Sequence, residues 1–318
     1  MQRTPMRQCA GTVFMVRPAA FGSNPQTAAS NAMQGAPPGD AAAVASRALA
    51  EFDGCVRALE SEGIRVVVGA DTPSPARPDA VFPNNWVSFH ADGTLVLYPM
   101  LAPNRRLERR EELVAQVCAA TGFQPRRRLD LSAHERGGRI LEGTGSLVLD
   151  HRARVAYAAR SARTDEGLVA EWARALGYQA EVFDALDARG QPYYHTNVLM
   201  WLGSRCAMVC SEALAAADRA RVLARLRADA DRELIEIDRG AVAAFAGNML
   251  ELASWDEALG DTSVLVMSTT ARAALAGPQL GQLGACVDTI LAVPLPTIER
   301  VGGGGARCML AEVPEVLP

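Results

Sequence analysis

Five polar residues, each followed closely by an apolar run, recur along the chain at nearly equal intervals. They are Asn85, Glu142, His195, Asn248 and Cys308, and the intervals between them are 57, 53, 53 and 60 residues. We call these residues the five anchors. Their spacing predicts five similar modules; if the modules close into a ring, the anchors meet at one central cavity. Chance spacing in an ordinary α/β protein is the alternative.

Short apolar runs alternate with alanine-rich stretches, which predicts an α/β fold. In the stretch 41–62, Leu49, Phe52, Val56 and Leu59 would share one face of a helix. The predicted helices cover residues 41–62, 107–121, 166–176, 212–227 and 268–276. The predicted strands cover residues 12–16, 65–68, 87–89, 94–97, 146–149, 155–157, 198–201, 206–209, 249–252, 263–267 and 289–291.

The composition excludes several classes of protein. With 318 residues, 49% of them hydrophobic, the chain can bury a large core, and a net charge of -4 gives no reason to expect nucleic acid. No apolar run reaches the roughly 18 residues that cross a bilayer, and residues 1–11 lack the apolar core of a signal peptide. The seven cysteines show no framework spacing and no CxxC or HExxH pattern. We therefore expect a cytoplasmic protein with reduced thiols and without a metal site.

Four consecutive glycines, residues 302–305, stand just before Cys308. Glycine permits positive φ and close approach of the backbone to a ligand. This pattern predicts an exposed thiol flanked by backbone N–H groups, which would lower its pKa and stabilise developing negative charge. A phosphate-binding loop is the rival interpretation, but the Gly-Lys-Ser/Thr pattern is absent. A buried structural cysteine beside a flexible loop is the other.

Two further anchors carry groups that complement a thiol. His195 lies at the start of an apolar run, and Glu142 is followed by Gly143-Thr144-Gly145. A thiol, an imidazole and a carboxylate together can activate a nucleophile and protonate a leaving amine. A hydrogen-bonded structural histidine and a solvated turn glutamate are the alternatives for these two residues.

Several motifs resemble those of one superfamily over nearly the whole chain. They are the glycine-rich cysteine motif, His195-Thr196-Asn197, Glu142-Gly143-Thr144-Gly145 and Arg160-Ser161-Ala162-Arg163-Thr164-Asp165. They resemble the guanidino-group-modifying enzymes, or pentein superfamily, which includes arginine deiminase and dimethylarginine dimethylaminohydrolase. Residues 17–24, with Thr27, Asn31 and Gln34, are most similar to the citrulline utilization hydrolases. The resemblance implies a five-bladed α/β propeller of pseudo-fivefold ββαβ modules, forming one catalytic domain over residues 1–318 without a metal or organic cofactor.

The resemblance also implies a mechanism. Cys308 would attack the central carbon of a guanidino or ureido group and form a covalent adduct. His195 would protonate the departing nitrogen and then activate water. Glu142 would hold His195 as the imidazolium or hydrogen-bond the substrate.

Amides stand where arginine deiminases carry carboxylates. Asn84 and Asn85 replace an acidic pair, and Asn197 replaces the aspartate of a His-Leu-Asp motif. An ionised carboxylate only accepts hydrogen bonds, whereas an amide also donates, which suits a neutral ureido group. These departures predict citrulline as the substrate, with ornithine, ammonia and carbon dioxide as products. Arginine or an N-substituted arginine remains the alternative.

Other residues match substrate-binding positions of the superfamily. Arg163, and Arg105 or Arg106, match arginines that bind an α-carboxylate, for which a guanidinium is well suited. Asp79 is predicted either to cap the loop that leads to Asn84 or to bind the substrate amine. Residues 22–39 form a long polar segment that is either a surface loop or an active-site lid.

Two other functions are compatible with these motifs. An amidinotransferase would use the same adduct with an amine in place of water, but such enzymes tend to be longer. A non-catalytic binding protein of the superfamily would have lost the thiol, the imidazole or the carboxylate. The expected partner is a small ureido or guanidino amino acid, and a homodimer is one candidate for the oligomeric state.

Overall fold

Five three-stranded sheets share one strand arrangement in the computed structural model, which describes residues 7–37, 39–256 and 260–317. In each sheet the first strand is antiparallel to the second, and the second is parallel to the third. The sheets are β15 (Ala311–Glu312), β1 (Thr12–Arg17) and β2 (Arg65–Ala70); β3 (Val87–Phe89), β4 (Thr94–Leu97) and β5 (Arg127–Asp130); β6 (Val148–Asp150), β7 (Val155–Ala159) and β8 (Gln179–Phe183); β9 (Met200–Leu202), β10 (Cys206–Val209) and β11 (Glu233–Glu236); and β12 (Leu250–Asp256), β13 (Gly260–Ser268) and β14 (Thr289–Val293).

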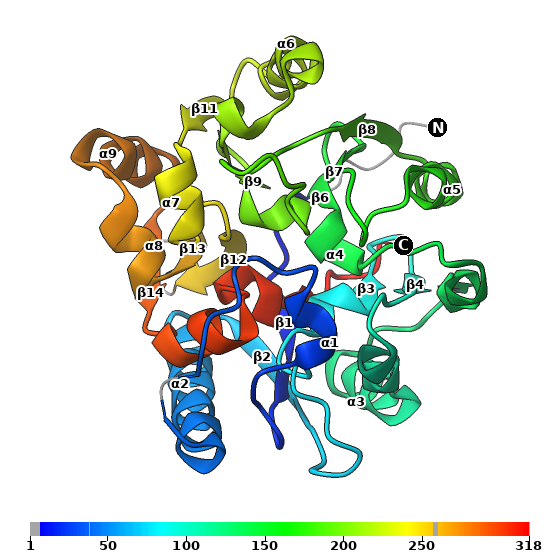
Figure 1. Ribbon diagram of the computed structural model, residues 1–318. Coiled ribbons are helices and arrows are strands. Elements are labelled where there is room, and N and C mark those ends of the chain that lie inside the picture. Colours follow the sequence, from blue (N-terminus) through cyan, green and yellow to red (C-terminus); the bar gives the residue numbers. More distant parts are fainter. Residues whose placement is uncertain (1–6, 38, 257–259, 318) are drawn as a thin grey trace.

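Helices connect the second strand of each sheet to the third. They are α2 (Ala41–Ser61), α3 (Glu111–Thr121), α5 (Glu166–Leu176), α6 (Ala216–Leu226), and the pair α8 (Thr269–Ala274) and α9 (Gly277–Cys286). In Figure 1 the sheets lie around a common centre and these helices lie outside them. Short helices α1 (Pro25–Ala28), α4 (Gly143–Ser146) and α7 (Arg239–Ala243) lie in the connecting segments.

The helix α2 shows why these outer helices form and how they pack. Asp40 caps its N-terminus by accepting a hydrogen bond from the backbone N–H of Ala43. Phe52 and Leu59 are fully buried, as predicted, whereas Leu49 and Val56 are only partly buried. The other buried residues of the helix are Val44, Ala48 and Cys55.

The C-terminal strand completes the sheet that contains the N-terminal strand. In this pairing Val13 lies opposite Glu312 and Phe14 opposite Ala311. Cys308 lies in the 3-10 helix Ala306–Met309, which leads into β15. In Figure 1 the red C-terminal part of the chain lies near the centre of the molecule.

The predicted α/β architecture and all eleven predicted strands are present, with shifted ends in most cases. The prediction was wrong in missing four strands, namely β5, β8, β11 and β15, and four helices, namely α1, α4, α7 and α9. The helix predicted from residue 107 begins at Glu111, because residues Pro103–Glu108 form a 3-10 helix instead. In the part of the chain that the structure describes, no helix is long and apolar enough to span a membrane.

Candidate active site

The five anchors occupy equivalent places in the five sheets. Each lies in a short turn that leads into the first strand of a sheet: Asn85 before β3, Glu142 before β6, His195 before β9, Asn248 before β12 and Cys308 before β15. Since the first strands lie nearest the centre, the anchors approach one another although they are far apart in the sequence (Figure 1).

A cavity of about 260 Å³ lies among these turns. Cys308, His195 and Asn85 line it, together with residues from three other segments. The remaining lining residues are Thr27, Asn31, Asp79, Phe82, Arg105, Arg163, Tyr194, Gly302, Gly303 and Gly304. The thiol and the imidazole therefore face the same space, as the sequence predicts for a nucleophile and its acid/base partner.

Glu142 is fully buried behind His195. Its Oε2 lies 2.8 Å from His195 Nε2, 3.2 Å from Arg163 Nη1 and 3.7 Å from Arg105 Nη1. Burial alone would raise the pKa of the Glu142 carboxyl, but Arg163, His195 and Arg105 outweigh burial and hold this pKa well below its usual range. Glu142 is therefore a carboxylate that orients the His195 ring.

The pKa of His195 lies below its ordinary value. Burial lowers its pKa to about 4, although the hydrogen bond and the charge of Glu142 raise it. Tyr194 packs against the imidazole with ring centroids 4.7 Å apart, and its hydroxyl donates to the carbonyl of Gly303 at 2.5 Å. The sequence reasoning did not identify Tyr194, although it directly precedes His195.

Cys308 is only 2% exposed, and two amides contact its sulfur. Asn248 Nδ2 lies 3.3 Å and Asn197 Nδ2 3.5 Å from Cys308 Sγ. Burial raises the pKa of the Cys308 thiol, whereas hydrogen bonds from the two amides and the charge of Arg307 lower it. The exposed thiol with a lowered pKa that the sequence predicts is therefore not observed: Cys308 is buried, its pKa is raised, and two amide groups contact its sulfur.

Arg105 and Arg163 both line the cavity with their charges compensated. Arg105 forms a two-pronged ion pair with Glu108, at 3.0 and 2.9 Å, and donates to Asn85 Oδ1 at 2.9 Å. Burial lowers its pKa, but Glu108, Asp79 and Glu142 more than reverse that effect, so Arg105 stays charged. Arg163 lies over the ring of Tyr194, 5.1 Å from the ring centroid.

The structure corrects two predictions about substrate-binding residues. Arg106 does not line the cavity, because its guanidinium turns toward Glu135, 3.3 Å away, and the carbonyl of Met100. Asn84 is fully buried beneath the cavity wall, where its Oδ1 accepts a hydrogen bond from Asn85 Nδ2 at 2.9 Å.

Asp79 lines the cavity and carries a free acceptor. Its Oδ2 accepts a hydrogen bond from Asn24 at 2.7 Å, whereas its buried Oδ1 has no hydrogen-bond partner. A buried carboxylate oxygen without a donor is costly, so this atom is ready to accept a hydrogen bond from a bound molecule.

The segment predicted as a loop or lid, residues 22–39, lies across the cavity, apart from residue 38, which is outside the described residues. Asn31 and Gln34 donate to the carbonyls of Gly303 and Gly302, each at 3.2 Å. Ser30 accepts a hydrogen bond from Arg163 Nη2 at 2.8 Å. The segment therefore contacts both the glycine-rich turn and Arg163, which lines the cavity.

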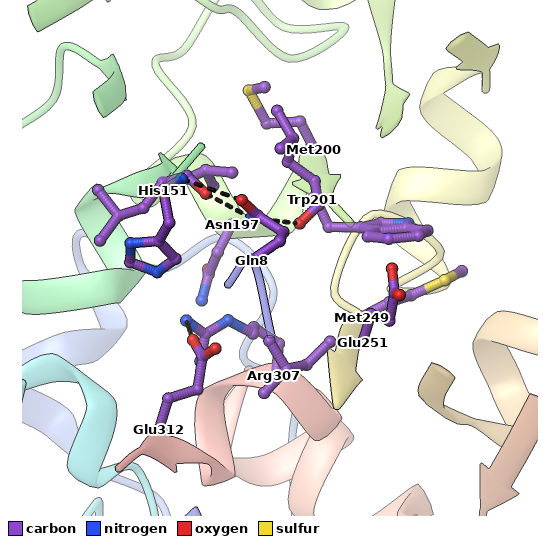
Figure 2. A pocket seen from close by; sticks show the side chains of 13 residues that line it. Gln8, His151, Asn197, Met200, Trp201, Met249, Glu251, Arg307 and Glu312 are labelled. Atoms are coloured by element: carbon purple, nitrogen blue, oxygen red, sulfur yellow. Dashed lines mark hydrogen bonds and ion pairs between the residues drawn. The ribbon is translucent and has the colours of Figure 1, made fainter. Parts of the chain in front are cut away.

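Asn197 and Gln8 are among the residues that line a second cavity, of about 400 Å³ (Figure 2). We call the cavity beside Cys308 the front cavity and this one the rear cavity. Asn197 lines this rear cavity and also contacts Cys308 in the front one. The side chain of Gln8 bridges two sheets at the rear cavity by donating to the carbonyls of Leu149 and Leu202, at 2.9 and 3.2 Å. Among the described residues no group of three or more His, Cys, Asp or Glu side chains is placed to hold a metal ion.

Known structures with similar folds are enzymes of arginine chemistry. The N-terminal domain of ArgZ, an arginine dihydrolase from the ornithine–ammonia cycle in cyanobacteria, aligns with a TM-score of 0.72 and 17% identity, covering 96% of this chain and 99% of that one. Unliganded AgrE aligns with a TM-score of 0.73 and 18% identity over 96% of this chain and 40% of that one. A dimethylarginine dimethylaminohydrolase adduct with S-methyl-L-thiocitrulline aligns with a TM-score of 0.64 and 16% identity, covering 95% and 99%.

At identities this low, these matches show a shared fold and nothing further. The chain spans 41% of full-length ArgZ. No curated protein sequence matches it significantly. A family profile described as N,N dimethylarginine dimethylhydrolase, eukaryotic, matches residues 17–315. The chain belongs to this family, and it is a hydrolase that acts on carbon–nitrogen bonds other than peptide bonds.

Proposed function

We propose that the chain hydrolyses the guanidino or ureido group of an arginine-related amino acid through a covalent adduct on Cys308. In this proposal the five sheets are the blades of a five-bladed propeller that forms one catalytic domain. The observation that carries it is the shared cavity, in which the thiol of Cys308 and the imidazole of His195 face the same space while Glu142 holds the ring.

The reaction begins when Cys308 gives its proton to His195 and the thiolate attacks the central carbon of the substrate. A carbon–sulfur bond forms, and the bond from that carbon to the departing nitrogen breaks as His195 returns the proton to it. The neutral His195 then takes a proton from water, and the resulting hydroxide adds to the carbon. The carbon–sulfur bond breaks, the product is released, and the Cys308 sulfur takes the proton back from His195, which restores the starting state. Glu142 stabilises the imidazolium in both half-reactions.

The charges around the cavity favour a cationic substrate. Arg105 and Arg163 contribute two positive charges, and Asp79 and Glu142 contribute two negative ones. Burial raises the pKa of the Glu108 carboxyl to about 7, although the charge of Arg105 lowers it, so Glu108 is only partly ionised at pH 7. The cluster thus carries a partial net negative charge with His195 neutral. A guanidino amino acid, such as arginine or dimethylarginine, would balance this charge and yield citrulline.

Hydrolysis of citrulline to ornithine, ammonia and carbon dioxide is the second candidate. The amides of Asn85 and Asn197 favour it, because no acidic side chain occupies their places near the thiol. The argument is weaker than the sequence alone indicates, since Asn84 does not line the cavity and the Oδ1 of Asn85 is already bonded to Arg105.

Arg163 is our candidate for the α-carboxylate of the substrate. Its Nε and Nη2 donate to Ser30 of the overlying segment, so movement of that segment would free both donors for a carboxylate. The unpartnered Oδ1 of Asp79 would accept a hydrogen bond from the positively charged end of the substrate.

A panel of substrates tests this proposal. Wild type and Cys308→Ala are incubated with L-arginine, dimethyl-L-arginine, L-citrulline and agmatine, while ammonia, dimethylamine, citrulline and ornithine are measured. We expect citrulline and the released amine from a guanidino amino acid, less turnover of agmatine, which lacks the carboxylate, and none by Cys308→Ala. Ornithine formed fastest from citrulline would favour the second candidate. A requirement for an added amine would indicate an amidinotransferase, and no turnover at all would indicate a binding protein.

A further inference from the structure

The amide of Asn248 lies beside the sulfur of Cys308, and its neighbours determine whether its NH₂ group or its oxygen faces them. Its Nδ2 lies 2.9 Å from the backbone carbonyl oxygen of Asn197 and 3.3 Å from Cys308 Sγ. Two acceptor oxygens would repel one another at 2.9 Å, so the NH₂ group, not the amide oxygen, faces Asn197. Asn248 therefore presents an N–H to the sulfur.

Three features of the backbone bring Asn248 to this place. Phe245, three residues earlier, has a φ of 63°, which a bulky residue adopts only when the surrounding structure requires it. A Cβ atom on Gly247 would overlap the carbonyl oxygen of Val198, so only glycine allows this close approach to the turn of Asn197. A Cβ atom on Gly305 would lie 2.8 Å from Asn248 Oδ1, so glycine is needed on the cysteine side as well.

The surroundings make this contact strong when the sulfur is charged. Asn248 is fully buried and Cys308 is 2% exposed, so little water competes for the sulfur. A donor that faces a charged acceptor in a dry site is worth more than a neutral hydrogen bond. In the described part of the chain, the bonded neighbours of the sulfur are amides rather than carboxylates.

We propose that Asn248 is a positioning residue that donates a hydrogen bond to the Cys308 thiolate, lowers the pKa of the thiol and fixes the direction of its attack. The proposal rests on the proposed function only in taking Cys308 as the nucleophile. Asn248 does not line the front cavity, so it acts on the substrate through the sulfur.

The pKa of the Cys308 thiol tests the proposal without any turnover. It is measured from the pH dependence of alkylation by a haloacetamidine, with Cys308→Ala supplying the background of the other six thiols. Loss of one hydrogen bond to a charged acceptor should raise the thiol pKa by about one to two pH units in Asn248→Ala. Asn248→Asp has nearly the same shape, cannot donate when ionised and adds a negative charge, so we expect at least as large a rise.

Gln8→Ala is the matched control. Gln8 is also a buried amide that joins two sheets through backbone carbonyls, but its bonded partners do not include Cys308. We expect Gln8→Ala to lower the free energy of unfolding and to leave the thiol pKa unchanged. A purely structural Asn248 would behave in the same way, so an unchanged thiol pKa in folded Asn248→Ala or Asn248→Asp overturns the proposal. Turnover that survives in Cys308→Ala would instead refute the proposed function.

Discussion

Gly145, in the short helix α4, lies against the ring of His195 and allows a specific perturbation of catalysis. A Cβ atom at this position would lie 2.7 Å from Cε1 and Nδ1 of His195 and 2.6 Å from Nδ2 of Asn85. The backbone of Gly145 is not in the left-handed region, so alanine meets no conformational obstacle there. The effect of Gly145→Ala therefore comes from the added methyl group alone.

The size of that effect follows from ordinary contact distances. Carbon atoms pack at about 3.5–4.0 Å, so the imidazole or the helix must move by roughly 0.8 Å or more. A displacement of about 1 Å in a catalytic group costs on the order of 100-fold in rate, or about 2.7 kcal/mol of activation free energy. We expect overpacking to cost a further ~1–3 kcal/mol in the free energy of unfolding.

Steady-state kinetics and denaturant unfolding of Gly145→Ala measure the two effects separately. Gly137→Ala is the control, because a Cβ atom at Gly137 meets nothing within 4 Å and the residue does not line the cavity. We expect kcat to fall about 100-fold in Gly145→Ala and to stay unchanged in Gly137→Ala. A folded Gly145→Ala with wild-type kcat would refute the placement of His195 as the acid/base group.

Three further predictions concern single side chains. Glu142→Gln should lower kcat by about 10²–10⁴-fold with the fold retained, because His195 loses the carboxylate that stabilises its protonated form; kinetics at several pH values check this. Asp79→Asn should raise KM by about 10- to 100-fold with a smaller change in kcat, because the charged hydrogen bond that it removes stabilises the bound substrate and the transition state equally. Burial lowers the pKa of His90 to about 3 from an unfolded value of 6.5, so the unfolded chain takes up this proton first and stability falls as the pH drops below 6.5. Between pH 6.5 and pH 5, uptake of this proton by the unfolded chain lowers the free energy of unfolding by about 2 kcal/mol. We expect this loss to be absent in His90→Gln when its unfolding is measured over the same pH range.

The sequence predicted well those strands that are buried on both faces. Val155–Ala159 and Cys206–Val209 are apolar throughout and fully buried, so a simple apolar run identifies them. The missed strand Arg127–Asp130 is mostly exposed at the outer edge, and its charged residues lack the apolar signal. The helix α9 was missed because Gly277 and Pro278, which begin it, are typical of turns.

The catalytic candidates were found for a different reason. Cys308, His195 and Glu142 belong to the five anchors, which recur at intervals of 53 to 60 residues, and glycines follow Glu142 directly and stand shortly before Cys308. Spacing therefore marks all three residues, and local composition marks two of them. Arg106 was wrongly selected because neighbouring arginines cannot be told apart by pattern, and only the fold shows that Arg105 alone turns inward. The contact of Asn248 with the sulfur depends on backbone geometry between two turns, which spacing alone does not encode.

Trapping the intermediate tests the central claim, that Cys308 forms a covalent bond to the substrate carbon. Wild-type enzyme is quenched in acid during turnover of its best substrate, and its peptides are analysed by mass spectrometry. We predict a substrate-derived mass on the peptide that contains Cys308 and unmodified peptides for the other six cysteines. Rapid turnover with an unmodified Cys308, or an adduct on another cysteine, would contradict the account.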